Sequence, residues 1–501
     1  MILDRQTCMQ ARISRDPRFD GKFFTGILST KIYCRSTCPV PTVKETNVRY
    51  FPTAAAAANA GYRPCLRCRP ESSPGTPAWL GTSSTVSRAL RLIWDGGLED
   101  DGIESLADRL GVGSRHLRRL FLRHIGAPPS AVAHTRRLHF AKKLIDETTL
   151  SMTDVAMASG FGCVRRFNAA IRKTYKRTPT HIRHLAHRKT TDAENQYTFN
   201  LRFRPPYHWS GILSFLAPRA TPGVEAVDAT SYSRTISLHG HHGFFHASLD
   251  EAHHALTVRV QIPDPTLLYP IIERIRSMFD LNADWLAIAQ HLHRDTDLKS
   301  RMRKTPGLRV PGSWNAFELA VRAILGQQIT VKGATLLAGR LAKAFGQPCA
   351  LAENLTHLFP APEVLAEANL TSIGLTKKRA ETIRALARAV CEERLNFERV
   401  DDLNALLTRF QEIPGIGPWT AEYVAMRALG DPDALPTGDL GLLHALNLKS
   451  ARELAERAAS WRPWRSYATM YLWTTPEKSP RHRQVPNRRE HKQHRRSMAQ
   501  L

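Results

Sequence analysis

The segment at residues 413–427 is Ile-Pro-Gly-Ile-Gly-Pro-Trp-Thr-Ala-Glu-Tyr-Val-Ala-Met-Arg. An apolar-Pro-Gly-apolar-Gly turn enters a run with helical periodicity, which is typical of a helix-hairpin-helix. Gly415 and Gly417 allow the backbone to turn tightly and to approach a phosphate group. The N–H groups and positive dipole end of the following helix then attract the phosphate charge. The segment therefore predicts a helical domain that binds phosphate groups.

An acidic residue follows this hairpin. The segment 435–442, Leu-Pro-Thr-Gly-Asp-Leu-Gly-Leu, places Asp439 about 20 positions after the hairpin. This arrangement resembles the helix-hairpin-helix DNA glycosylase superfamily, in which that aspartate is essential. Breaking an N-glycosidic bond builds positive charge on the sugar, and a nearby carboxylate stabilises that charge and orients the attacking water. Asp439 is therefore the expected catalytic residue, although an aspartate here can also simply cap the next helix.

Aromatic residues accompany the hairpin. Members of the superfamily that also cut the DNA strand carry a lysine in the hairpin helix, where this chain has Trp419. The resemblance therefore implies a monofunctional glycosylase without lyase activity. Trp419, Tyr423 and Trp473 are expected to form a pocket in which a flipped, cationic base stacks by cation–π attraction. Without the resemblance, the i, i+4 spacing of Trp419 and Tyr423 favours ordinary core packing.

Longer matches narrow the resemblance. The segments 205–210, 306–312, 316–327 and 461–468 resemble AlkA-type 3-methyladenine DNA glycosylases, and the likeness covers about residues 197–475. It implies an α+β domain at 197–290 and an all-α helix-hairpin-helix domain at 300–475. Where the family places an apolar wedge that fills the gap left by the flipped base, this chain has Gln328. The residue after Asp439 is Leu440 rather than an aromatic residue.

The composition suits a DNA-binding protein of several domains. The chain has 501 residues, 71 Lys and Arg against 45 Asp and Glu, and a net charge of +26. This length predicts three to four domains, and this charge predicts a polyanionic partner. No apolar run approaches the roughly 20 residues that cross a bilayer. We therefore expect no membrane partner and a cytoplasmic, nucleoid-associated protein of a bacterium.

Low-complexity stretches divide the chain. Residues 70–82 and 188–195 are rich in Pro, Ser, Thr or charge and are interpreted as linkers. They separate a Cys-rich module at 1–76 from a helical block at 87–187, and that block from the long segment that begins at 197. The basic tail at 476–501 has no apolar period and is expected to be disordered. It acts either as a solvated segment or as a non-specific DNA contact.

Four of the eight cysteines lie between positions 34 and 68. Cys34 and Cys38 form one close pair, Cys65 and Cys68 another, and together they can supply four thiolates to one tetrahedral Zn²⁺. By spacing alone, a purely structural zinc site is favoured. The surrounding residues, 31–39, 47–51 and 61–70, resemble the N-terminal domain of the Ada alkylation-response proteins.

The Ada resemblance implies chemistry at the zinc. In that family the first cysteine of the first pair, here Cys34, irreversibly accepts a methyl group from a DNA methyl phosphotriester. Zinc keeps the thiol deprotonated, and methylation removes one negative charge, so the methylated protein is expected to bind DNA more tightly. The expected phosphate contacts are Arg35, Arg67 and Arg69.

The helical block contains two helix-turn-helix patterns. Residues 103–111 lead into 114–121, and residues 152–161 lead into 164–171, each through a glycine-containing turn. The order and the ending at 175–183 resemble the AraC-type DNA-binding domain, which also follows the zinc module in Ada. The alternative is a helical bundle with a solvated basic face. The expected DNA contacts are Ser114, Arg115, Arg118, Arg119, Arg165, Arg166 and Asn168.

Together these patterns predict a mainly α, multidomain fusion: a small α/β zinc domain, an all-α AraC-type domain, an α+β domain and an all-α glycosylase domain. The expected function is excision of 3-methyladenine- and 7-methylguanine-type bases, combined with damage sensing and transcription regulation. The rival is a transcription activator whose C-terminal half binds damaged DNA without excising bases. A structural nucleoid protein explains the charge but neither the paired cysteines nor Asp439. The expected partners of the monomer are damaged and promoter double-stranded DNA, with RNA polymerase as a further partner of an activator.

Overall fold

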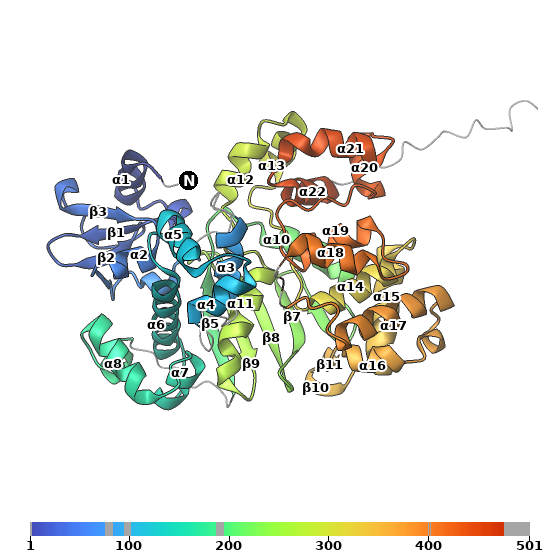
Figure 1. Ribbon diagram of the computed structural model, residues 1–501, viewed down its shortest axis with the longest axis horizontal. Helices are drawn as coiled ribbons and strands as arrows, with labels where there is room; N and C mark the ends of the chain where they lie inside the picture. Colours follow the sequence, from blue (N-terminus) through green and yellow to red (C-terminus); the bar gives the residue numbers. More distant parts are fainter. Residues whose placement is uncertain are drawn as a thin grey trace, which may run out of the picture.

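The computed structural model describes residues 3–75, 84–94, 102–186, 195–398, 400 and 402–474. A five-stranded sheet lies near the middle of the molecule (Figure 1). The N-terminal module and the helical block lie on one side of it, and the helices of the C-terminal half, orange and red, lie on the other. This arrangement confirms the expected mainly α, multidomain fold. The predicted tail at 476–501 and most of the predicted linkers lie outside the described residues.

The N-terminal module is a small sheet covered by two helices. The strands follow the order β3-β1-β2-β4, and only the β2–β4 pair is parallel. Phe24, Tyr33, Phe51 and Tyr62 form its apolar core. Its elements are α1 (Arg5–Ile13), β1 (Phe24–Ile27), β2 (Ile32–Arg35), β3 (Val48–Phe51), α2 (Ala54–Asn59) and β4 (Arg63–Pro64).

The helical block contains both predicted helix-turn-helix units. The turns contain Gly111 at φ 66° and Gly160 at φ 75°, the left-handed conformation that glycine adopts most easily. The units differ in packing, because α3–α5 enclose a core of their own, whereas α6–α9 share a core with the central sheet. The helices are α3 (Ser84–Trp94), α4 (Gly102–Arg109), α5 (Ser114–His124), α6 (Pro129–Glu147), α7 (Met152–Ala158), α8 (Val164–Tyr175) and α9 (Pro179–Leu185).

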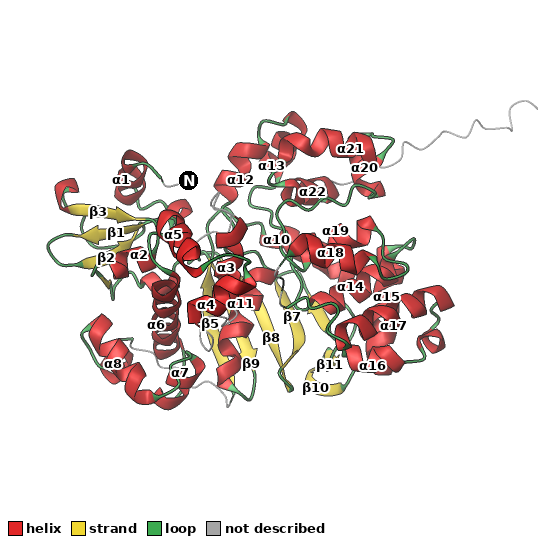
Figure 2. Ribbon diagram, viewed as in Figure 1, coloured by secondary structure: helices red, strands yellow, loops and turns green. Residues whose placement is uncertain are grey.

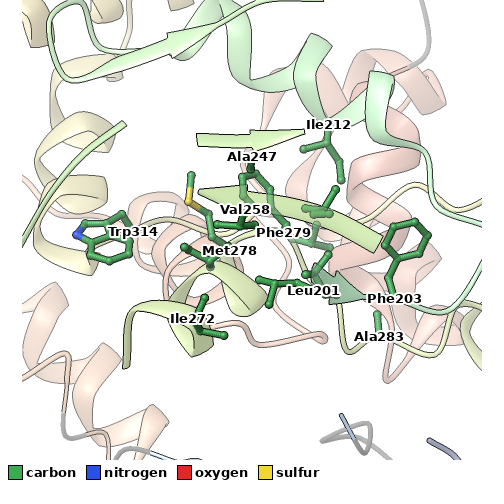
Figure 3. Packing of buried hydrophobic residues seen from close by; sticks show 14 of the residues in the cluster. Leu201, Phe203, Ile212, Ala247, Val258, Ile272, Met278, Phe279, Ala283 and Trp314 are labelled. Carbon is green, nitrogen blue, oxygen red and sulfur yellow. The ribbon is translucent and has the colours of Figure 1, made fainter. Parts of the chain in front are cut away.

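The central sheet is antiparallel, with the order β5-β9-β8-β7-β6 (Figure 2). Alternating apolar residues in β7 and β9 confirm the strand pattern that the sequence predicts. Phe203, Val258 and Phe279 pack in the core formed with the neighbouring helices (Figure 3). The elements are β5 (Gln196–Arg202), α10 (Trp209–Leu216), β6 (Glu225–Val227), β7 (Ser231–Leu238), β8 (His241–Asp250), β9 (Ala255–Gln261), α11 (Leu268–Met278), α12 (Trp285–Leu292) and α13 (Thr296–Lys304).

The described residues after α13 are helical apart from one short hairpin, β10 (Pro348–Ala352) with β11 (Leu355–His357), which no sequence pattern predicted. Their helices pack into two cores, and α19 contributes to both: Val424 to one, Ala425 to the other. The helices are α14 (Ala316–Gly326), α15 (Val331–Phe345), α16 (Pro362–Glu367), α17 (Lys377–Cys391), α18 (Leu403–Gln411), α19 (Pro418–Arg427), α20 (Leu440–Leu446), α21 (Ala451–Arg457) and α22 (Arg465–Trp473). Among the described residues, none of the helices is both long and apolar enough to cross a membrane.

Candidate active site and metal centre

Asp439 precedes α20 and holds three hydrogen bonds with its carboxylate. Its Oδ1 accepts from the Leu442 backbone N–H and from the Trp473 indole, each at 3.0 Å. Its Oδ2 accepts from the Trp419 indole at 3.0 Å. The Leu442 bond is an ordinary helix N-cap. The two indole bonds go beyond a cap, because they fix the orientation of a half-buried carboxylate with donors from two other helices.

The two indoles that contact this carboxylate are packed against two further aromatic rings. The rings of Trp419 and Tyr423 stack directly, with centroids 5.2 Å apart and an interplanar angle of 10°. Tyr423 lies 6.1 Å from Trp473, and Trp473 stacks on Phe215 at 6.2 Å. The structure thus brings together the three predicted pocket residues. We call these three residues and Phe215 the aromatic group. Phe215 lies on α10, in the part of the chain from β5 to α13 that contains the central sheet and that we call the sheet domain. Its apolar helix gave no sign of a functional position.

The predicted hairpin joins α18 to α19. Gly415 has φ +94°, and a Cβ there would lie 2.3 Å from Thr382 Oγ1, so this position requires glycine. Gly417 does not, because it caps α19 at φ −99° and a Cβ would meet nothing within 4 Å. The expectation that both glycines serve the tight turn is therefore corrected to Gly415 alone.

The segment after α14 lies against this hairpin. The Gln327 side chain donates to the Gly415 carbonyl at 3.0 Å and to Thr420 Oγ1 at 3.1 Å. The next residue, Gln328, is exposed and adopts φ 58°, so the side chain predicted to fill the gap in the DNA is free of the protein core. Leu440, the other departure from the family pattern, is 69% exposed.

The four cysteines of the N-terminal module converge. Cys34 lies on β2, and the parallel pairing of β2 with β4 brings Cys65 and Cys68 beside it. All four cysteines are buried, and their sulfur atoms lie within 4.8 Å of one another. Tetrahedral zinc with Zn–S bonds of about 2.3 Å places its sulfurs about 3.8 Å apart, so this donor set fits one Zn²⁺.

Arg35, next to Cys34, is placed differently from the prediction. It is 5% exposed, and its guanidinium pairs with the buried carboxylate of Asp20. It also donates to the Cys68 carbonyl at 3.1 Å, and its backbone N–H donates to Cys68 Sγ at 3.4 Å. These contacts argue against the predicted phosphate contact and make Arg35 a support of the cysteine cluster.

The other two predicted cations of the module differ from each other. Arg69 pairs with Asp146 at 2.7 Å and with Glu147 at 3.3 Å, both on α6, so it ties the module to the helical block. Arg67 is exposed. Arg67 therefore keeps its place as a predicted phosphate contact.

The predicted contacts of the helix-turn-helix units lie on the two second helices. Phe121 of α5 and Phe167 of α8 are fully buried and turn the opposite faces outward. The arginines on those faces are exposed, and within the described ranges none forms an ion pair with a carboxylate. These arginines are Arg115, Arg118, Arg119, Arg165 and Arg166.

A cleft of about 2010 Å³ lies elsewhere in the structure. Tyr269, Trp314 and Trp464 line it, and Asp439 does not. Its lining mixes carboxylates and guanidiniums. The geometry of Asp439, rather than the size of a cavity, therefore identifies the candidate active site.

Four protein-family descriptions match the chain in order. "Metal binding domain of Ada" matches residues 7–71 and "Helix-turn-helix domain" matches residues 106–184. "AlkA N-terminal domain" matches residues 198–315, and "HhH-GPD superfamily base excision DNA repair protein" matches residues 321–458.

Two curated relatives cover different shares of the chain. A probable bifunctional transcriptional activator/DNA repair enzyme AlkA of Mycobacterium tuberculosis is 41% identical over 482 residues, 95% of this chain and 97% of the relative. DNA-3-methyladenine glycosylase 2 of Escherichia coli is 33% identical over 55% of this chain and 97% of its own length.

Among solved structures, a 3-methyladenine DNA-glycosylase from Archaeoglobus fulgidus matches with a TM-score of 0.50 at 22% identity, over 55% of this chain and 97% of that one. This likeness shows the fold of the C-terminal half.

Proposed function

Since this chain belongs to the family of AlkA-type bifunctional transcriptional activator/DNA repair enzymes, we propose that Asp439 is the residue with which it excises alkylated purines. The chain is a DNA glycosylase joined to an Ada-type zinc domain and to helix-turn-helix units that bind double-stranded DNA. It serves DNA repair and transcription activation.

The observation that carries the proposal is the pair of indole bonds to Asp439. They hold the carboxylate beside rings on which a flipped base can stack. As the N-glycosidic bond breaks, positive charge develops on the sugar and the carboxylate stabilises it. The same carboxylate orients water for attack at C1′. A base methylated at a ring nitrogen leaves as a neutral molecule, so no second acid is needed. Trp419 in place of a lysine leaves no amine for a Schiff base in the hairpin helix.

Release of free 3-methyladenine and 7-methylguanine from methylated DNA tests this role. Asp439→Asn keeps a side-chain oxygen for the Leu442 cap but loses the charge, so release should fall on the order of a thousandfold. Asp402 is a matched control, because it caps α18 by accepting from Asn404 N at 2.8 Å and lies outside the site. Asp402→Asn should release both bases at the native rate. If the native chain releases no base, or Asp439→Asn releases bases normally, the chain binds damaged DNA without excising bases.

We further propose that Cys34 accepts methyl groups from DNA methyl phosphotriesters. The thiolate sulfur attacks the methyl carbon, a C–S bond forms, the C–O bond breaks and the phosphodiester anion leaves. Zinc held by the four cysteines would keep the thiols deprotonated at neutral pH. The thioether cannot lose the methyl group again, so each chain reacts once.

Transfer of labelled methyl groups to the protein tests this step. Cys34→Ala should accept none. Cys8→Ala is the control, because Cys8 is buried in the same module but outside the cluster. The Cys8→Ala variant should still accept one methyl group per chain. Transfer to Cys34→Ala would contradict the assignment.

The remaining site residues are proposed as DNA contacts. The exposed arginines of α5 and α8 and Arg67 would meet phosphates and groove edges, and Gln328 would fill the gap left by the flipped base. We propose that the chain is monomeric and that RNA polymerase is its partner at promoters. We also propose domain limits at 1–76, 87–187, 197–290 and 300–475, with a basic tail at 476–501.

A further inference from the structure

The phenol side of the aromatic group is surrounded by arginines. Arg427 donates to the Tyr423 hydroxyl at 2.7 Å, and its guanidinium carbon lies 5.5 Å from the Tyr423 ring centroid. The guanidinium carbon of Arg219 lies 4.0 Å from the ring centroid of Phe215. Burial raises the pKa of Tyr423, but the charges of Arg427, Arg219 and Arg322 outweigh it, so this pKa lies below its ordinary value. The aromatic group is therefore contacted by the Asp439 carboxylate at its two indoles and by arginines at the Tyr423 phenol.

Two of these arginines are fully committed to the protein. Arg427 is 4% exposed and donates to the carbonyls of Pro311 and Gly312 as well as to Tyr423. Arg322 pairs with Glu225 at 2.8 Å and Glu318 at 3.1 Å, so these two carboxylates already bind its guanidinium. Neither has donors to spare for a ligand.

Arg219 differs from both. It is half-buried, and among the described residues it has no carboxylate within ion-pair distance. One of its N–H groups donates to the Phe215 carbonyl at 2.9 Å, and its charge helps to lower the pKa of Tyr423. A guanidinium has five N–H donors and no acceptor, so several donors of Arg219 have no protein partner.

We propose that Arg219 is a specificity-determining residue that donates to the carbonyl oxygen of a flipped base. This inference rests on the proposed glycosylase function. A guanine-type purine carries an acceptor oxygen at C6, whereas an adenine-type purine carries an amino group, itself a donor, at the same position. A guanidinium favours the first and repels the second. The substrate class favoured by Arg219 is therefore alkylated purines with a C6 carbonyl.

Arg219 also modifies the predicted cation–π attraction. A positive charge beside Phe215 and Tyr423 opposes a second positive charge on the base, so stacking favours cationic bases less than the rings alone would. Selection then depends on where the base carries oxygen as well as on its charge. The sheet domain supplies this selection, because Arg219 ends the short 3-10 helix η4 (Ala217–Arg219), and its carbonyl accepts from Arg322 of α14.

The test measures two bases in one reaction. DNA treated with a methylating agent releases 7-methylguanine and 3-methyladenine together, so their ratio does not depend on the amount of active protein. Arg219→Met keeps an unbranched chain over Phe215 and removes the donors, and it should lower the ratio of 7-methylguanine to 3-methyladenine released about tenfold. Arg219→Lys keeps the charge without the planar fork of donors, so its ratio should lie between those of the native chain and Arg219→Met.

The control is Arg274→Met. Arg274 also lies over an aromatic ring, Trp314 at 5.6 Å, but it pairs with Glu398 outside the aromatic group, so its loss should leave the ratio unchanged. An unchanged ratio in Arg219→Met, or an equal fall in both bases, would overturn the inference. If Arg219→Met melts at a lower temperature, the ratio in Arg219→Lys decides. Release of neither base by the native chain would refute the glycosylase function instead.

Discussion

The two reactive centres are built in opposite ways. The cysteine cluster is local: its four ligands lie between positions 34 and 68, and all are buried. The Asp439 site is assembled from α10, α19, α20 and α22, which span more than half of the chain, and its carboxylate is half-buried. The proposed methyl transfer would need only a reactive sulfur, whereas base excision needs a pocket that admits and selects a base.

The supports of the centres meet at the sheet domain. Asp20 pairs with Arg35 beside the cysteines, and its carbonyl accepts from the buried Arg204 at 2.8 Å. Lys22 pairs with Asp284 at 2.6 Å. The N-terminal module is thus fixed to the domain that supplies Phe215 and Arg219. Because the cysteine cluster is local, damage to it should stay within the N-terminal module and spare base release.

Zinc removal should have the largest effect. Structural zinc contributes on the order of 10 kcal/mol to the folding of small domains. A strong chelator should therefore abolish methyl transfer, while base release persists because every residue of the Asp439 site lies outside the module. Both activities are measured in one sample, with zinc re-addition as the control. Loss of base release together with methyl transfer would show that the two centres are not independent.

Asp20→Ala should have the next largest effect. It leaves the guanidinium of Arg35 buried without its partner, which costs about 3–5 kcal/mol. We expect faster zinc loss to a colorimetric chelator and a lower melting temperature of the module. Asp16→Ala is the matched control, because Asp16 pairs with Arg18, whose side chain is 52% exposed, and should cost about 1 kcal/mol or less. Equal zinc-loss rates in the two variants would contradict the supporting role of the Arg35–Asp20 pair.

The difference in construction also explains what the sequence could predict. The cysteine ligands are visible because their chemical type and close spacing together define a metal site. The hairpin, and with it Asp439, can be recognised in the sequence because the turn requires Gly415. The residues that support Asp439 cannot be recognised in the sequence. Phe215 and Arg219 precede Asp439 by more than 200 positions, and they lie in an ordinary apolar helix and in the short 3-10 helix that follows it.

Arg35 shows the same limit from the other direction. A basic residue next to Cys34 predicts a phosphate contact, and nothing nearby in the chain reveals that Asp20 will bury it. Likewise, the helical periodicity of α3–α9 predicts two helix-turn-helix units, but not that only the first keeps a separate core. Local patterns identify elements and ligand sets, whereas partners from distant elements require the tertiary structure.

The hairpin glycines give a smaller, paired prediction. Gly415→Ala places a Cβ 2.3 Å from Thr382 Oγ1 at a positive φ, so we expect a loss of about 2 kcal/mol in stability and weaker binding to undamaged duplex DNA. Gly417→Ala meets nothing within 4 Å and should cost about 0.5 kcal/mol or less. Thermal unfolding and DNA titration check both. Similar losses in the two variants would mean that the turn does not depend on Gly415 in particular.

The two indoles give the smallest and most specific effect. Trp419→Phe and Trp473→Phe each keep a ring for stacking and remove one N–H donor to Asp439. Each should lower the rate of base release about tenfold with little change in DNA affinity. Because both donors orient one carboxylate, the double variant should lose less than the product of the single losses. Trp285→Phe, which removes a donor to Tyr471 at 2.9 Å, is the control and should leave the rate unchanged. Strictly multiplicative losses would mean that the two indoles act independently rather than through the orientation of one carboxylate.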